Sequence, residues 1–113
     1  MKIYHNPRCK KSRETLKRIQ ENGTEPEIIK YLDTPPSKEE MRDILGKLGM
    51  NASDIIRKTE KIYKEEFKGR ELSEEEWLGA LQQYPKLMQR PIVVEGEDAV
   101  IGRPPENVDR LFS

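Results

Sequence analysis

The stretch that decides the fold is KIYHNPRCKKSRETLKRIQENGTEPEIIKYL, residues 2–32. Residues 2–5 alternate in polarity and stop at Asn6-Pro7, which predicts a strand followed by a turn. A helix is expected next, ending at Asn22-Gly23. β-branched residues then cluster in residues 27–32 and predict a second strand. A strand, a helix and a strand in this order normally place two parallel strands side by side.

The rest of the chain predicts a helical segment and then a second pair of strands. The expected elements are a helix that begins at the capping box Ser37/Glu40, a short helix at 51–58, an irregular or weakly helical stretch at 59–71, a helix from the capping box Ser73/Glu76, a hairpin of strands 91–95 and 99–102, and a last helix opened by Pro104-Pro105. Without the middle helices the order is βαββα, the layout of a thioredoxin-like α/β domain. We predict one domain over residues 1–113 with a mixed sheet and a helical insertion at about residues 37–88.

The composition excludes several classes of protein. The 21 Lys and Arg residues balance the 21 Asp and Glu residues, so the net positive charge typical of non-specific nucleic-acid binding is missing. The longest aliphatic run is Ile92-Val93-Val94, whereas a membrane helix needs about 20 apolar residues. One Cys and one His are too few for an internal disulfide or for most metal sites. We expect a cytoplasmic monomer that binds no metal, nucleic acid or membrane.

The single cysteine, Cys9, lies in the most basic stretch of the chain, residues 7–18. It follows the first predicted strand directly and stands at the start of the predicted helix. A helix N-terminus and nearby cations both stabilise the thiolate, which is the nucleophilic form of cysteine. Because four of its neighbours are cationic, we expect a reactive thiol in an unburied position rather than a structural cysteine in the core.

Three polar residues near Cys9 are candidates for supporting roles. Ser12 occupies the place of the second thiol in Cys-x-x-Cys oxidoreductases, so an oxidised Cys9 needs an external thiol. The Ser12 hydroxyl is expected either to bond the thiolate or to cap the helix, and the sequence leaves both open. His5 is expected either to tune the thiol and position a proton, or to be structural. Asn6 before Pro7 is explained equally well by turn chemistry.

The segment His5-Asn6-Pro7-Arg8-Cys9-x-x-Ser12-Arg13 is similar to the active-site loop of the glutaredoxin-coupled arsenate reductases. The likeness continues, in order, through Asn22-Gly23-Thr24-Glu25-Pro26, Tyr31-Leu32 before Pro35-Pro36, Ile56-Arg57-Lys58, Gln89-Arg90-Pro91-Ile92-Val93-Val94 and Gly102-Arg103-Pro104. The resemblance implies a thioredoxin-like fold with a helical insertion. It also implies that Cys9 is the nucleophile, that the arginines of the last three segments hold the oxyanion, and that the bond before Pro91 is cis.

The activity that the resemblance implies is reduction of arsenate to arsenite. Glutathione would be the co-substrate, glutaredoxin the partner that regenerates the thiol, and no bound cofactor is needed. Two alternatives stay open at this point. One is a regulator like Spx, although the missing second Cys at position 12 argues against a disulfide switch. The other is a glutathione-dependent thiol reductase with a different substrate.

Overall fold

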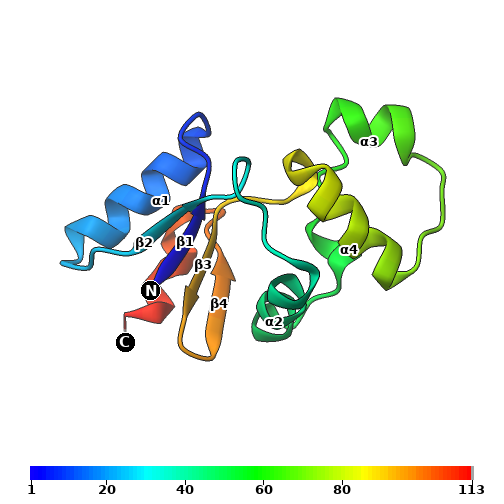
Figure 1. The fold of residues 1–113 in the computed structure, drawn as a ribbon. Helices are drawn as coiled ribbons and strands as arrows, with labels where there is room; N and C mark the ends of the chain where they lie inside the picture. Colours follow the sequence, from blue (N-terminus) through cyan, green and yellow to red (C-terminus); the bar gives the residue numbers. More distant parts are fainter. Residues whose placement is uncertain (113) are drawn as a thin grey trace. The chain divides into compact units, whose positions relative to one another are not determined.

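The computed structural model describes residues 1–112, which divide into two compact units: a sheet unit, residues 1–34 and 90–112, and a helical unit, residues 35–89. The elements in chain order are β1 (Lys2–His5), α1 (Lys10–Glu21), β2 (Glu27–Lys30), α2 (Lys38–Leu48), the 3₁₀ helix η1 (Ala52–Ile55), α3 (Lys61–Glu66), α4 (Glu74–Gln83), the 3₁₀ helix η2 (Pro85–Leu87), β3 (Ile92–Glu95), β4 (Asp98–Ile101) and the 3₁₀ helix η3 (Pro105–Leu111) (Figure 1). No helix within residues 1–112 has the length and apolar character to cross a bilayer. The single-domain description stays a prediction.

The sheet has the order β2-β1-β3-β4. β1 and β2 are parallel with His5 opposite Lys30, as the strand-helix-strand pattern predicts, whereas β1–β3 and β3–β4 are antiparallel. Gly96, at a φ of 60°, begins the two-residue turn between β3 and β4, a backbone conformation that favours glycine. This mixed sheet confirms the predicted thioredoxin-like α/β class.

The core of the sheet unit lies on the face covered by α1 and η3. Ile3, Val93 and Val100 stand opposite one another on β1, β3 and β4, and they pack with Ile19 of α1 and Val108 of η3. All five side chains are β-branched, and the three on the strands suit a pleated surface. The core therefore fixes α1, and with it Cys9 at the helix start, against the end of β1.

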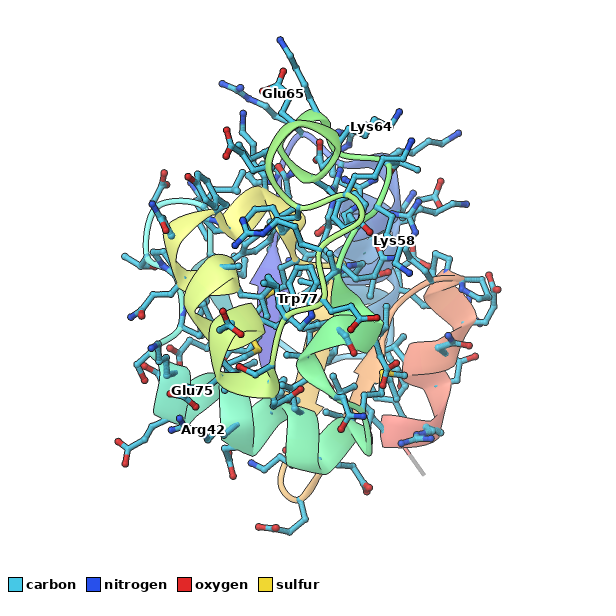
Figure 2. All side chains as sticks on the ribbon, turned by 90° about the vertical axis from the view of Figure 1, so that its right-hand side faces the viewer. Arg42, Lys58, Lys64, Glu65, Glu75 and Trp77 are labelled. Carbon is cyan, nitrogen blue, oxygen red and sulfur yellow. The ribbon has the colours of Figure 1, made fainter. Side chains whose placement is uncertain are left out.

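The helical unit is held together by aromatic packing and by ion pairs between α2 and α4. Trp77 of α4 stacks with Tyr63 and packs against Phe67, with ring centroids 6.5 and 5.6 Å apart. Arg42 of α2 and Glu75 of α4 point toward one another and form a 2.5 Å ion pair (Figure 2). Capping boxes begin α2 and α4 at the two predicted serines, so both predicted helix starts are confirmed.

The helix predicted at 51–58 is wrong in extent. Only Ala52–Ile55 is helical, and it is a 3₁₀ turn. Ile56 instead forms a β-bridge with Met88, flanked by the Arg57 N–H to Leu87 carbonyl bond of 2.7 Å. Extended pairing with a distant segment satisfies these backbone groups and overrides the local helical pattern.

Two other predicted elements differ in their details. The second strand ends at Lys30 rather than at residue 32, because the Lys30 carbonyl accepts N–H bonds from Asp33 and Thr34 and the chain turns there. The last predicted helix is a 3₁₀ helix from Pro105 to Leu111. The weakly helical stretch contains the short helix α3, in agreement with its description.

Gly102 is expected to be intolerant of a side chain. An added Cβ would stand 2.7 Å from the Thr15 side chain and 3.0 Å from Pro91 Cγ, both buried groups. We expect Gly102→Ala to lower the free energy of unfolding by about 1–3 kcal/mol through overpacking. Gly46→Ala, in open space within α2, should instead raise it by about 0.5–1 kcal/mol. Denaturant melts of both variants check this, and equal midpoints for both would contradict it.

Candidate active site

Cys9 occupies the N-cap position of α1, directly after the turn that leaves β1. Its N–H donates to the Asn6 carbonyl and its own carbonyl accepts from the Arg13 N–H, both at 3.0 Å, so the backbone is fixed on both sides. The side chain is only 9% exposed. The expectation of an unburied thiol is therefore wrong. It was based on the charged residues next to Cys9 in the sequence, whereas the turn and two arginines from distant segments cover the sulfur.

Two guanidinium groups from distant segments reach the sulfur. Arg103 Nη1 lies 3.8 Å from Cys9 Sγ and 3.5 Å from the Arg90 carbonyl oxygen. The Arg90 side chain hydrogen-bonds the thiol as well. The two arginines stand at the ends of the β3–β4 hairpin, and antiparallel pairing of β3 with β1 brings that hairpin to the loop.

These surroundings determine the acidity of the thiol. Burial raises the pKa of Cys9, but the Arg90 hydrogen bond and charge, together with the backbone N–H groups of Ser12 and Lys11, outweigh burial and leave the pKa below its ordinary value. A larger fraction of thiolate at neutral pH follows. The helix start contributes through its free N–H groups, as the sequence indicates.

The lowered pKa predicts that Cys9 is alkylated at lower pH than an ordinary cysteine. The rate of Cys9 alkylation by iodoacetamide should rise with a midpoint below that of the same thiol in the urea-unfolded chain, because only the thiolate reacts. Since folding lowers this pKa, the thiolate stabilises the fold at pH above the unfolded value, and that contribution is lost as pH falls through the folded value. Coincident profiles for folded and unfolded chains would contradict the arrangement.

His5, Asn6 and Ser12 form one hydrogen-bonded group under the loop. His5 Nδ1 lies 2.7 Å from Ser12 Oγ, which also accepts the Asn6 N–H at 3.0 Å. Asn6 Oδ1 accepts the Arg8 N–H at 3.0 Å, which is an Asx-turn bond. Burial, and then the charges of Lys30 and Arg13, lower the pKa of His5, so its neutral form is favoured. The Ser12 hydroxyl thus stabilises the turn, and its backbone N–H, with that of Lys11, helps to lower the pKa of the thiol.

The remaining predicted site residues fall into both units. The Arg90–Pro91 bond is cis, the isomer that the resemblance implies, and Arg103–Pro104 is cis as well. Arg57 lies in the helical unit, and its side chain is largely buried. Its Nη1 donates to Glu60 Oε1 at 3.0 Å. Its participation at Cys9 stays a prediction.

Two residues to which the sequence analysis gave no individual role, Arg13 and Thr15, hold the site together. Arg13 Nη1 donates to the Pro7 carbonyl at 3.0 Å and braces the loop from α1. Thr15, fully buried, donates its hydroxyl to the Gly102 carbonyl at 3.0 Å and so ties α1 to the residue before Arg103. Their spacing from Cys9 could have indicated these roles, because it places Arg13 one helical turn into α1.

The arrangement suits attack on a tetrahedral oxyanion. A thiolate-prone sulfur is the nucleophile, and guanidinium groups beside it offer paired donors for anionic oxygens. Within residues 1–112 no three His, Cys, Asp or Glu side chains gather as a metal site would require.

Comparison with known proteins places the chain among its relatives. The model described as the ArsC family matches residues 4–111. The chain belongs to the ArsC family. This ArsC chain is 42% identical over 114 residues to an arsenate reductase of Neisseria meningitidis, covering 99% of this chain and 97% of that one. It is 54% identical over 110 residues to the Escherichia coli protein YfgD, covering 96% and 92%.

Solved structures agree with this membership. The arsenate reductase from Vibrio cholerae superposes on this ArsC chain with a TM-score of 0.92 and 45% identity, covering 96% of this chain and 94% of that one. Its high score extends the fold assignment over nearly the whole length. The predicted family and the predicted fold class are both confirmed.

Proposed function

We propose that this ArsC-family chain reduces arsenate to arsenite, with Cys9 as nucleophile and glutathione as the second thiol. The observation that carries the proposal is the position of the sulfur, which is bonded by Arg90 and lies 3.8 Å from Arg103 Nη1. Relatives at 42% identity over nearly the whole chain are named arsenate reductases, which supports arsenate as the oxyanion.

The first step is attack of the Cys9 thiolate on arsenic. A sulfur–arsenic bond forms and one oxygen of arsenate leaves as water once it is protonated. Arg90 and Arg103 hold the remaining oxygens, because a guanidinium presents its donors in a fixed fork that matches paired oxygens. Arg57 is proposed as the third arginine of this cradle, which requires it to exchange Glu60 for the anion.

The second step needs an external thiol because the chain contains one cysteine. The glutathione sulfur bonds to Cys9 Sγ, the sulfur–arsenic bond breaks, and its electron pair stays on arsenic. Arsenic gains two electrons and leaves as arsenite, while each sulfur gives up one. The product is a Cys9–glutathione disulfide, and glutaredoxin is proposed to reduce it.

Supporting roles follow from the hydrogen bonds under the loop. Neutral His5 and Ser12 hold the turn, and Asn6 shapes it, so that the N–H groups of α1 point at the sulfur. Pro91 sets the backbone between Arg90 and β3. None of these residues is proposed to take part in bond making. The protein is proposed to act as a cytoplasmic monomer.

A coupled assay tests the proposal. Purified protein, glutathione, glutaredoxin, glutathione reductase and NADPH are combined, and arsenite is quantified directly. Arsenate-dependent arsenite formation supports the proposal. Undetectable turnover at millimolar arsenate, with Cys9 shown to be reduced, would contradict the proposal. Glutathionylation of Cys9 by glutathione disulfide, reversed by glutaredoxin and without any turnover of arsenate, would favour a thiol reductase with another substrate.

A further inference from the structure

A hollow of about 310 Å³ opens beside the active-site loop, within the sheet unit. Its walls are loop residues 5–8 and the chain after β2, with Lys30, Leu32 and Asp33. Parallel pairing sets Lys30 opposite His5, and the Asp33 N–H donates to the Lys30 carbonyl at 3.0 Å. Both walls are therefore hydrogen-bonded turns, and the volume is at the lower end of the range for small-molecule sites, about 300–1,000 Å³.

The charged groups of the hollow are available to a ligand. Arg8, Lys30 and Asp33 are exposed, and none of the three forms an ion pair with another side chain of residues 1–112. Three cations of the neighbouring helix α1 do form ion pairs. Lys10 and Lys11 both lie within 4 Å of Glu14, and Arg18 is paired with Asp109. The hollow thus offers two cations and one anion without internal partners.

The hollow and the arginines approach the loop from opposite sides. The sheet order is β2-β1-β3-β4, and the loop follows the inner strand β1. Arg90 and Arg103 come from the ends of the β3–β4 hairpin, whereas the hollow lies at the end of β2. Cys9 follows Arg8 directly in the chain but does not itself line the hollow.

We propose that this hollow is the binding site for glutathione, a deepening that rests on the proposed function. At neutral pH glutathione carries two carboxylates and one ammonium group. Arg8 and Lys30 match the two carboxylates, and Asp33 matches the ammonium, so each charge of the tripeptide has one partner. Glutathione bound here presents its thiol to Cys9 while the arginines hold the oxyanion.

A binding titration tests the site without chemistry. S-methylglutathione has no free thiol, so its binding to the wild-type chain is followed by amide chemical shifts. We expect saturable shifts at residues 6–8 and 30–33. Saturable binding with shifts centred on Arg90 and Arg103 would overturn the assignment, as would the absence of any saturable binding.

Charge variants identify the groups that hold the ligand. Lys30→Ala and Arg8→Ala should each weaken S-methylglutathione binding about fivefold, and the double variant about twentyfold. Lys2→Ala is the matched control, because it removes the same charge from the other end of the neighbouring strand β1 and should change binding less than twofold. Equal weakening by Lys2→Ala and Lys30→Ala would mean that only bulk charge matters and would overturn the site.

Kinetics separates this inference from the proposed function. If the wild-type protein reduces arsenate, the Lys30→Ala variant should have a KM for glutathione about fivefold higher and an unchanged KM for arsenate. Unchanged KM for glutathione in both Lys30→Ala and Arg8→Ala would overturn the site while the function stands. If wild-type protein forms no arsenite, the function fails, and the S-methylglutathione titration still decides whether the hollow binds the tripeptide.

Discussion

Cys9→Ser is expected to form no arsenite above background, a loss on the order of a thousandfold or more. Serine can form neither the arsenic adduct nor the disulfide with glutathione, so both steps stop. The fold should be retained. Cys9 is the N-cap of α1, serine is a favoured N-cap residue, and its hydroxyl can accept the N–H groups of Lys11 and Ser12, which now lower the pKa of the thiol.

The measurement is arsenite formation together with a denaturant melt of the same preparation. An unfolding midpoint at or above that of the wild type, with activity lost, assigns the effect to chemistry. Cys9→Ala is the informative companion, because it removes the nucleophile without supplying the hydroxyl cap of serine, so it should be less stable than Cys9→Ser by about 1 kcal/mol. Measurable turnover in Cys9→Ser would mean that the sulfur is not the nucleophile.

Arg90→Lys is expected to lower kcat/KM for arsenate by about 10- to 100-fold and to raise the pKa of Cys9. Lysine keeps the positive charge but loses the planar fork, so a hydrogen bond to the thiolate and a paired contact to the anion are lost. Arg103→Lys should affect the anion more than the thiol, because Arg103 is exposed and its Nη1 stands 3.8 Å from the sulfur.

Arg18→Lys is the matched control for these arginine variants. Arg18 lies in the same unit and forms a two-bond contact with Asp109, at 2.7 Å for each bond, away from the sulfur. Losing its fork should leave kcat/KM and the alkylation profile of Cys9 unchanged. An alkylation midpoint in Arg90→Lys equal to that of Arg18→Lys would show that the guanidinium fork does not lower the thiol pKa.

Local chemistry explains why several elements were predictable from sequence. Each capping box is a contact between residues three apart, so Ser37 and Ser73 predict the starts of α2 and α4 independently of the rest of the fold. The turn at Asn6-Pro7 and the start of α1 likewise depend on neighbouring residues. The 3₁₀ turn at Ala52–Ile55 was misjudged because Ile56 pairs with Met88, a partner that no local pattern names.

The site divides in the same way. The helix start that lowers the thiol pKa could be deduced from the position of Cys9 in the sequence, but the convergence of Arg90 and Arg103 could not. That convergence depends on the antiparallel register between β1 and β3, and only the family resemblance indicated it beforehand. The burial of Cys9 was missed for the same reason, since charged neighbours in sequence do not reveal which distant side chains cover a sulfur.

Intact-mass spectrometry of one reaction cycle tests the central claim most directly. Reduced protein is incubated without oxygen with arsenate and glutathione but without glutaredoxin, and arsenite is counted in the same sample. We predict one glutathione on Cys9 and one arsenite released per chain, with neither appearing when arsenate is left out. Arsenite release without the Cys9–glutathione disulfide, or formation of the disulfide independent of arsenate, would contradict the account.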